Sequence, residues 1–238
     1  LQGDWSSDVC SSDLGVDDGV SQVLDYLDRN DLAKDTIVFY TSDNGFFLGE
    51  MGMYDKRFMY EPSLRVPLLV RGYGIQNPGR VPGGIVMNVD LAPTFLDIAG
   101  VRIPPDMHGQ SLVPWFRGEV PKGWRSSMYY RYYHDPGHHN TRQHYGVRTE
   151  THKLVHYWKK DAWELFDLRA DPNEQRNLAD DPAQAETLRA LKAELARLRK
   201  ELGDEDRFAN VLPRDGVDGN FAEHGNLGRQ SVEIGRAH

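Results

Sequence analysis

The chain has 238 residues, of which 39% are hydrophobic and 11% aromatic, enough apolar material for one sizeable core or a core with a smaller companion. Its formal net charge is -8, and its lysines and arginines are scattered, which excludes the basic footprint expected of a nucleic-acid-binding protein. No uninterrupted apolar run approaches the roughly 18–20 residues of a membrane-spanning helix, so we expect no membrane span.

Both ends of the sequence look foreign to a fold. The string "DVCSSDL" is what a common sequencing-adapter read encodes, and "EIGRAH" is what its reverse complement gives in another frame. We therefore expect residues 1–14 and 231–238 to be adapter-derived, and residues 211–230 to be an irregular, glycine-rich tail. The only cysteine, Cys10, lies in the first of these segments, so cysteine usage says nothing about the redox compartment.

The region from residue 15 to 113 has the pattern of an α/β unit. Apolar residues at helical spacing predict an amphipathic helix: Val16, Val20, Val23, Leu24 and Leu27. The run Thr36–Tyr40 is β-branched, aromatic and uncharged, as in a strand of a parallel sheet that helices cover on both faces. A second such run is Val66–Gly72, and Ile85–Asp90 is a candidate third strand. This order of elements indicates an α/β fold.

A helix is predicted after the third run. Asp90 can cap its start, Pro93 fits its first turn, and Gly100 ends it. Its apolar stripe consists of Leu91, Phe95, Ile98 and Ala99.

From residue 114 to 210 the pattern changes to that of a small α+β subdomain. Four short aromatic-rich runs, "SMYYRYY", "HYGVRT", "KLVHYW" and "WELFDL", predict an antiparallel sheet. Asp181 and Pro182 then open a helix that ends at Gly203. Leucines three and four residues apart predict that this helix lies on the small sheet: Leu188, Leu191, Leu195, Leu198 and Leu202.

The stretch "TSDNGFFLGEMGMYDKR" contains the chemistry. Asp43 and Asn44 follow the first predicted strand, where reactive groups gather in open α/β sheets. Their oxygen atoms suit Ca²⁺ or Mg²⁺, although "SDNG" alone is more often a plain turn. Lys56, twelve residues after Asn44, could hold a dianionic ester as a point charge or be a solvated surface lysine. A metal and an ammonium that converge on one tetrahedral oxyanion would stabilise charge on a leaving oxygen.

Three segments together resemble the sulfatase family of the alkaline-phosphatase-like superfamily: "YTSDNGFFLGEMGMYDKRFMYEPSLRVPLLVRGYG", "NVDLAPTFLDIAGVRIPPDMHGQSLVPWFRGE" and "HYGVRTETHKLVHYWKKDAWELFDLRADPNEQRNL". The resemblance implies an alkaline-phosphatase-like sheet whose C-terminal part is residues 15–113. It also implies Asp43 and Asn44 as calcium ligands and Lys56 as a catalytic residue that contacts the sulfate. His144 and the weaker candidate Arg57 are implied substrate contacts, and a sheet-end histidine satisfied by backbone groups is an equally good reading of His144.

Two features depart from the family pattern. Met51 stands where many sulfatases have the histidine of "GEHG", and methionine cannot replace its hydrogen bonds. The C-x-P-S-R-like motif, whose cysteine or serine becomes the formylglycine nucleophile, is missing, since "CSSDLG" around Cys10 lacks its proline and arginine. We therefore expect a C-terminal fragment of a calcium-dependent sulfatase that is inactive alone.

The expected substrate is a sulfate ester on a saccharide or aryl group, and the family suggests a periplasmic or extracellular location. Two other functions stay open: a phosphonate or phosphate monoester hydrolase of the same superfamily, and a non-catalytic carbohydrate-binding module. The histidines at 134, 138, 139 and 144 could suggest zinc, but their spacing favours a solvated or carbohydrate-contacting loop. The sequence does not indicate an oligomeric state.

Overall fold

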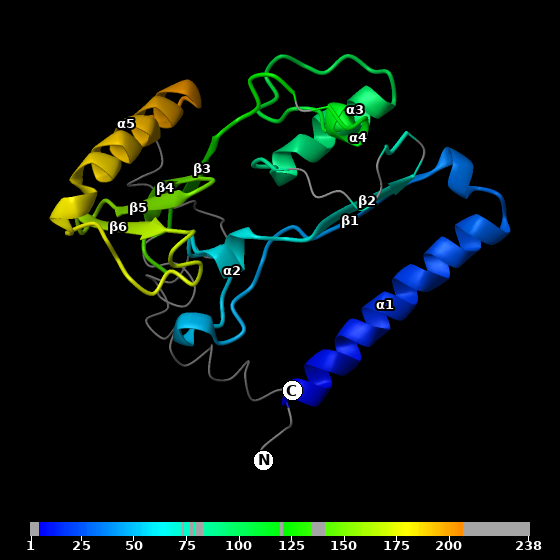
Figure 1. Ribbon diagram of the computed structural model, residues 1–238, viewed down its shortest axis with the longest axis horizontal. Helices are drawn as coiled ribbons and strands as arrows, with labels where there is room; N and C mark the ends of the chain where they lie inside the picture. Colours follow the sequence, from blue (N-terminus) through cyan, green and yellow to red (C-terminus); the bar gives the residue numbers. More distant parts are fainter. Residues whose placement is uncertain are drawn as a thin grey trace, which may run out of the picture.

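The computed structural model describes residues 5–72, 74–76, 79, 83–119, 121–134 and 141–206 (Figure 1). Its α-helices are α1 (Trp5–Arg29), α2 (Glu61–Leu64), α3 (Leu91–Ile98), α4 (Val113–Phe116) and α5 (Ala185–Glu201). Its strands are β1 (Ile37–Thr41), β2 (Leu68–Gly72), β3 (Ser127–Tyr132), β4 (His144–Thr149), β5 (His152–Tyr157) and β6 (Ala162–Asp167). Short 3-10 turns are η1 (Ala33–Asp35), η2 (Glu50–Gly52), η3 (Asn88–Asp90) and η5 (Pro182–Gln184).

The first two strands form a ribbon. β1 and β2 pair with Phe39 opposite Val70, and the pairing is antiparallel, so the predicted parallel pairing is wrong for these two strands. The pairing is antiparallel because the connection between β1 and β2 is a compact loop that stays at the carboxyl end of β1. The amide of Gly45 donates to Ser63 O at 2.9 Å, and β2 therefore starts where β1 ends and runs back beside it. An uncharged apolar run does not reveal strand direction.

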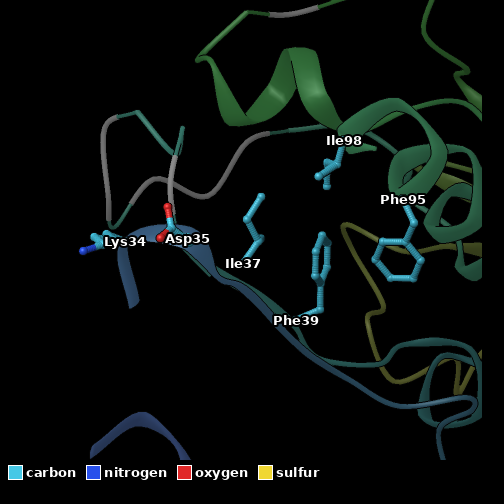
Figure 2. Close-up of a pocket in the computed structure, with 6 residues that line it drawn as sticks. All are labelled: Lys34, Asp35, Ile37, Phe39, Phe95 and Ile98. Atoms are coloured by element: carbon cyan, nitrogen blue, oxygen red, sulfur yellow. The ribbon is translucent and has the colours of Figure 1, made fainter. Parts of the chain in front are cut away.

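Helices lie on both faces of the ribbon, which confirms the predicted α/β class (Figure 1). Alternate side chains of a strand point to opposite faces, and Phe39 meets α3, where its ring forms an edge-to-face contact with Phe95 at 5.0 Å. Figure 2 shows Ile37 and Phe39 facing Phe95 and Ile98 across a cavity of about 590 Å³ at the amino end of β1.

The predicted N-terminal helix is present as α1, and it faces the other side of the ribbon. A cavity of about 440 Å³ separates Val20 and Leu24 of α1 from Val38 of β1. The guanidinium of Arg71 on β2 binds both carboxylate oxygens of Asp28 at 2.8 and 3.0 Å. Residues 5–14 continue α1. None of the helices in the described part of the chain is both long and apolar enough to cross a membrane.

The candidate third strand is not a strand. Residues 85–87 belong to no helix or strand, and η3 (Asn88–Asp90) leads directly into α3, which contains Pro93 and is followed by Gly100 as predicted. The carboxylate of Asp90 does not cap α3. It is fully buried and binds both guanidinium nitrogens of Arg125 at 2.5 and 2.6 Å. The carboxylate of Asp90, which the local sequence pattern predicted as a helix cap, therefore binds Arg125, a residue distant in sequence.

The C-terminal subdomain matches its prediction closely. All four aromatic-rich runs are strands, and they form an antiparallel sheet in the order β3-β4-β5-β6. Asp181 accepts the amide of Ala183 at 3.0 Å and caps η5, from which α5 continues. The helix lies on the sheet (Figure 1), where its leucines bury a core made of Tyr145, Val147, Leu154, Leu165, Leu191, Leu195 and Leu198.

A buried group of four charges joins the two parts of the fold. Lys153 on β5 is fully buried, and its ammonium lies 2.9 Å from Glu61 and 2.6 Å from Glu174. Arg148 on β4 binds both oxygens of Glu61 at 3.0 Å. Burial alone would raise the pKa of Glu61, but the hydrogen bonds and charges of Arg148 and Lys153 outweigh burial and lower it to about 2. Because Glu61 begins α2, this group fastens the loop that follows β1 to the C-terminal sheet.

An aromatic cluster forms the second part of this junction. The imidazole of His144, at the start of β4, is fully buried and stacks near Phe58, Tyr130 and Tyr157, with ring centroids 5.3–5.8 Å away. Its Nδ1 lies 2.7 Å from the carbonyl of Arg142, and its Nε2 has no hydrogen-bond partner among the described residues. Burial lowers the pKa of His144 to about 4, because the charged form would lose its hydration.

The replacement Lys153→Met should lower the free energy of unfolding by about 3–5 kcal/mol, because Glu61 and Glu174 would then keep buried charge without their shared cation. Urea unfolding followed by circular dichroism measures this. Lys200→Met, an exposed lysine on α5, is the control and should change stability by no more than about 0.5 kcal/mol. A loss below about 1 kcal/mol for Lys153→Met would contradict the structural role of the cluster.

Acidification should destabilise the fold through His144. The unfolded chain binds a proton near pH 6.5 and the folded chain only near pH 4, so stability falls as the pH decreases between these values, by about 3 kcal/mol in total. His144→Phe should remove this part of the pH dependence, whereas His108→Phe, at an exposed position, should keep it. Equal slopes in wild type and His144→Phe, measured by urea unfolding from pH 4 to 7, would refute a buried neutral imidazole.

Candidate active site

A tight turn follows the carboxyl end of β1 and presents Asp43 and Asn44. The hydroxyl of Ser42 donates to Asn44 O at 2.8 Å, and the side-chain amide of Asn44 donates to Gly45 O at 2.7 Å. Asn88 reaches across from η3 and donates to the carbonyls of Ser42 and Asp43 at 3.2 and 2.8 Å. These bonds hold the backbone of the turn, while the side chain of Asp43 is exposed.

Gly45 is where the turn meets α2. A Cβ atom at this position would lie 2.1 Å from the carbonyl oxygen of Pro62, which no side chain can tolerate. The glycine therefore permits the close approach through which its amide reaches Ser63 O at 2.9 Å. Ser63 in turn donates its hydroxyl to Lys56 O at 2.7 Å. One serine thus links the backbone of the Asp43 turn to the backbone of Lys56.

Lys56 itself is exposed, and both of its neighbours in sequence are held in place. Asp55 is buried, and its Oδ1 accepts the amide of Lys56 and, at 3.0 Å each, the amide and the guanidinium of Arg57. Asp55 therefore fixes the backbone on either side of the lysine. It also forms an ion pair with the guanidinium of Arg57, the residue that we predicted as a substrate contact. The lysine ammonium projects from this anchored loop.

His144 lies beside this loop, but its ring is enclosed. Phe58 stacks on the imidazole, and the hydroxyl of Tyr130 donates to Arg57 O at 2.5 Å. The structure thus brings Arg57 and His144 to one junction between the loop and β4. Of the two readings of His144, the sheet-end histidine bonded to a backbone carbonyl describes its present contacts, and its role toward a substrate stays a prediction.

The turn offers the kind of oxygen ligand that calcium prefers, but it offers too few of them. A carboxylate and an amide oxygen are hard ligands, whereas calcium takes six to eight oxygens. Among the residues that the structure describes, no group of three or more histidine, cysteine, aspartate or glutamate side chains is arranged to hold a metal. This also applies to His134, so the described histidines form no zinc site; His138 and His139 lie outside the described residues.

Two residues of the site had no predicted role. Asp55 stands out in the sequence only as the acid before Lys56, and its burial follows from tertiary packing. Asn88 belongs to a segment that we expected to be a strand, so nothing local indicated that it would bond to the Asp43 turn. The cavity in Figure 2 lies at the opposite, amino end of β1 and is mainly apolar, which makes it unsuited to an anionic ester.

Known proteins show the same combination of sequence and fold. The family model described as "N-sulphoglucosamine sulphohydrolase, C-terminal" matches residues 49–201. The N-acetylglucosamine-6-O-sulfatase of Bacteroides thetaiotaomicron is 42% identical over 205 residues, which cover 85% of this chain and 37% of that protein. The human N-acetylglucosamine-6-sulfatase is 43% identical over 121 residues, covering 50% of this chain and 22% of the relative.

A solved structure provides the corresponding match in three dimensions. It is described as a protein in complex with its substrate D-glucosamine-2-N,6-O-disulfate, and it superimposes with a TM-score of 0.79 at 42% identity. The match covers 83% of this chain and 40% of that one, so the chain spans about two fifths or less of the length of these relatives. Both its sequence and its fold show that the chain belongs to the sulfatase family of the alkaline-phosphatase-like superfamily, whose C-terminal region it matches.

Proposed function

We propose that this chain is the C-terminal part of a calcium-dependent sulfatase that removes a sulfate ester from an amino-sugar saccharide. The observation that carries the proposal is the shared anchoring of two exposed, opposite charges at the carboxyl end of β1. Ser63 bonds to Gly45, next to the Asp43 turn, and to the carbonyl of Lys56. The site can therefore present a metal-binding carboxylate and an ammonium to one anionic group.

The relatives support the substrate class. The curated relatives from Bacteroides thetaiotaomicron and from human are both named for sulfated N-acetylglucosamine, and the solved relative is described with a sulfated glucosamine. We infer that a 6-O-sulfated glucosamine unit is the substrate of the complete enzyme. This is narrower than the saccharide or aryl sulfate expected from sequence.

In this mechanism Lys56 binds the sulfate and stabilises the negative charge that accumulates on its oxygens as the ester bond breaks. Asp43 and Asn44 would hold part of a calcium shell, and a bound calcium ion supplies Lewis-acid stabilisation of the same charge. Asp55 and Ser63 keep the Lys56 backbone in one position. The nucleophile is expected to be a formylglycine from a segment other than this chain.

Activity can be tested in a chimera in which residues 16–206 replace the matching part of the Bacteroides thetaiotaomicron relative. The chimera should hydrolyse glucosamine 6-sulfate, and Lys56→Ala should lower kcat/KM by about 100-fold or more, because a preorganised charge at the developing oxyanion is lost. Lys200→Ala, on the exposed face of α5, is the matched control and should leave the rate unchanged. Faster turnover of a phosphonate ester than of the sulfate ester would assign the site to the rival hydrolase class.

The isolated chain should show negligible sulfatase activity and should bind calcium weakly, with a dissociation constant above about 10⁻³ M, because two oxygen ligands do not complete a calcium shell. Isothermal titration calorimetry measures the binding, with Asp43→Ala as the variant that should abolish any remaining heat. Measurable aryl sulfate turnover by the isolated chain, lost in Lys56→Ala, would disprove the expected inactivity.

A further inference from the structure

The loop between the Asp43 turn and Lys56 folds back on itself. The amide of Phe47 donates to Asp55 O at 2.7 Å, and the amide of Gly49 donates to Met53 O at 3.0 Å. The sum of the residue numbers in each pair is the same, as in the register of two antiparallel strands. Extended to the neighbouring residues, this register pairs Phe46 with Lys56 and Leu48 with Tyr54, in a loop that forms no β-strand.

The two faces of this folded loop differ sharply in exposure. Phe47 and Asp55, which form one pair, are 0% and 2% exposed. The neighbouring positions are exposed, so burial and exposure alternate along the loop as they do along an extended chain with one buried face. Phe46, Leu48 and Tyr54 are 47%, 60% and 63% exposed, and Lys56 is exposed as well. One face thus presents three large apolar side chains around a single ammonium.

The side chain of Tyr54 packs against the loop. A Cβ atom at position 49 would lie 3.4 Å from the hydroxyl oxygen of Tyr54 and 3.8 Å from its Cζ. The end of the ring therefore lies against the backbone of Gly49, while the residue as a whole is 63% exposed. Tyr54 and Lys56 are two residues apart on the same face, which separates their Cα atoms by roughly 6–7 Å.

We propose that this face, formed by Phe46, Leu48, Tyr54 and Lys56, is the saccharide platform of the enzyme. Tyr54 stacks on the C–H face of the sugar ring whose sulfate Lys56 binds, and Phe46 and Leu48 extend the apolar surface around it. The inference rests on the proposed function and adds to it the residues that select a sugar over a bare sulfate ion. Aromatic rings suit this task because a sugar ring has apolar C–H faces and a polar edge.

The charge within the face distinguishes a sugar sulfate from a second protein surface. A stable protein interface covers about 800 Å² on each partner and depletes lysine at its core. Here three apolar side chains accompany one lysine, an arrangement that complements a small ligand with an apolar body and one anionic group. The platform also includes the lysine that the proposed mechanism uses.

The test compares two probes that bind the same lysine. Binding of glucosamine 6-sulfate and of inorganic sulfate to the full chain is measured by amide chemical shifts in NMR titrations. Tyr54→Ala should lower the affinity for glucosamine 6-sulfate by about three- to ten-fold. It should leave the affinity for inorganic sulfate within about two-fold of the wild-type value. Tyr54→Phe should retain the affinity for the sugar. Tyr26→Ala, which removes a tyrosine of similar exposure from α1, is the control and should change neither affinity.

The outcomes separate this inference from the proposed function. Unchanged sugar affinity in Tyr54→Ala, with both probes weakened by Lys56→Ala, overturns the platform alone. Equal losses for both probes in Tyr54→Ala would mean that the residue only supports the loop. Inorganic sulfate binding that survives Lys56→Ala, or no binding of either probe, overturns the role of Lys56 itself and the platform with it. A self-association that Tyr54→Ala abolishes, seen by sedimentation with sugar binding intact, would assign the face to a second copy.

Discussion

The arrangement of the site depends on the buried charges around Glu61. This carboxylate is bound by Lys153 and Arg148 from the C-terminal sheet, and Glu174 accepts its backbone amide at 2.7 Å. Charges of both signs are buried together, which avoids the large cost of an isolated buried ion. The cluster fixes the first residue of α2, and two residues later Ser63 bonds to Gly45 and Lys56. A contact between the two parts of the fold therefore sets the position of the Lys56 backbone.

The same junction explains why buried and exposed groups are divided so clearly. On the side that faces the C-terminal sheet, Asp55 is used to hold the loop backbone and His144 is kept neutral among aromatic rings. Asp43 and Lys56, in contrast, are exposed to solvent. A site that must bind an anion needs its cation accessible, and the loop supplies this by directing alternate side chains in opposite directions. The platform around Tyr54 is a consequence of that alternation.

Met51 adds a local feature to this loop. Its backbone has φ of 53° and ψ of 20°, a left-handed conformation that is unfavourable for most residues with a side chain and less so for histidine, asparagine or aspartate. Methionine offers no hydrogen-bond donor at this place. The strained position lies in η2 at the tip of the folded loop, between the pairs that form its ladder.

The sequence by itself determined the elements whose signals are local. The four aromatic-rich strands, the leucine stripe of α5, the helical start at Asp181 and Pro182 and the Pro93 helix all depend on spacing within one segment, and each appears as predicted. The family could also be recognised from the sequence, because each of the three segments that resemble it is a continuous stretch. Only the tertiary structure decided the antiparallel direction of β2, the pairing of Asp90 with Arg125, the burial of His144 and the support that Asn88 and Asp55 give to the site. These depend on partners far apart in the chain, and a carboxylate or an imidazole does not reveal from its neighbours in sequence which distant group will bury it.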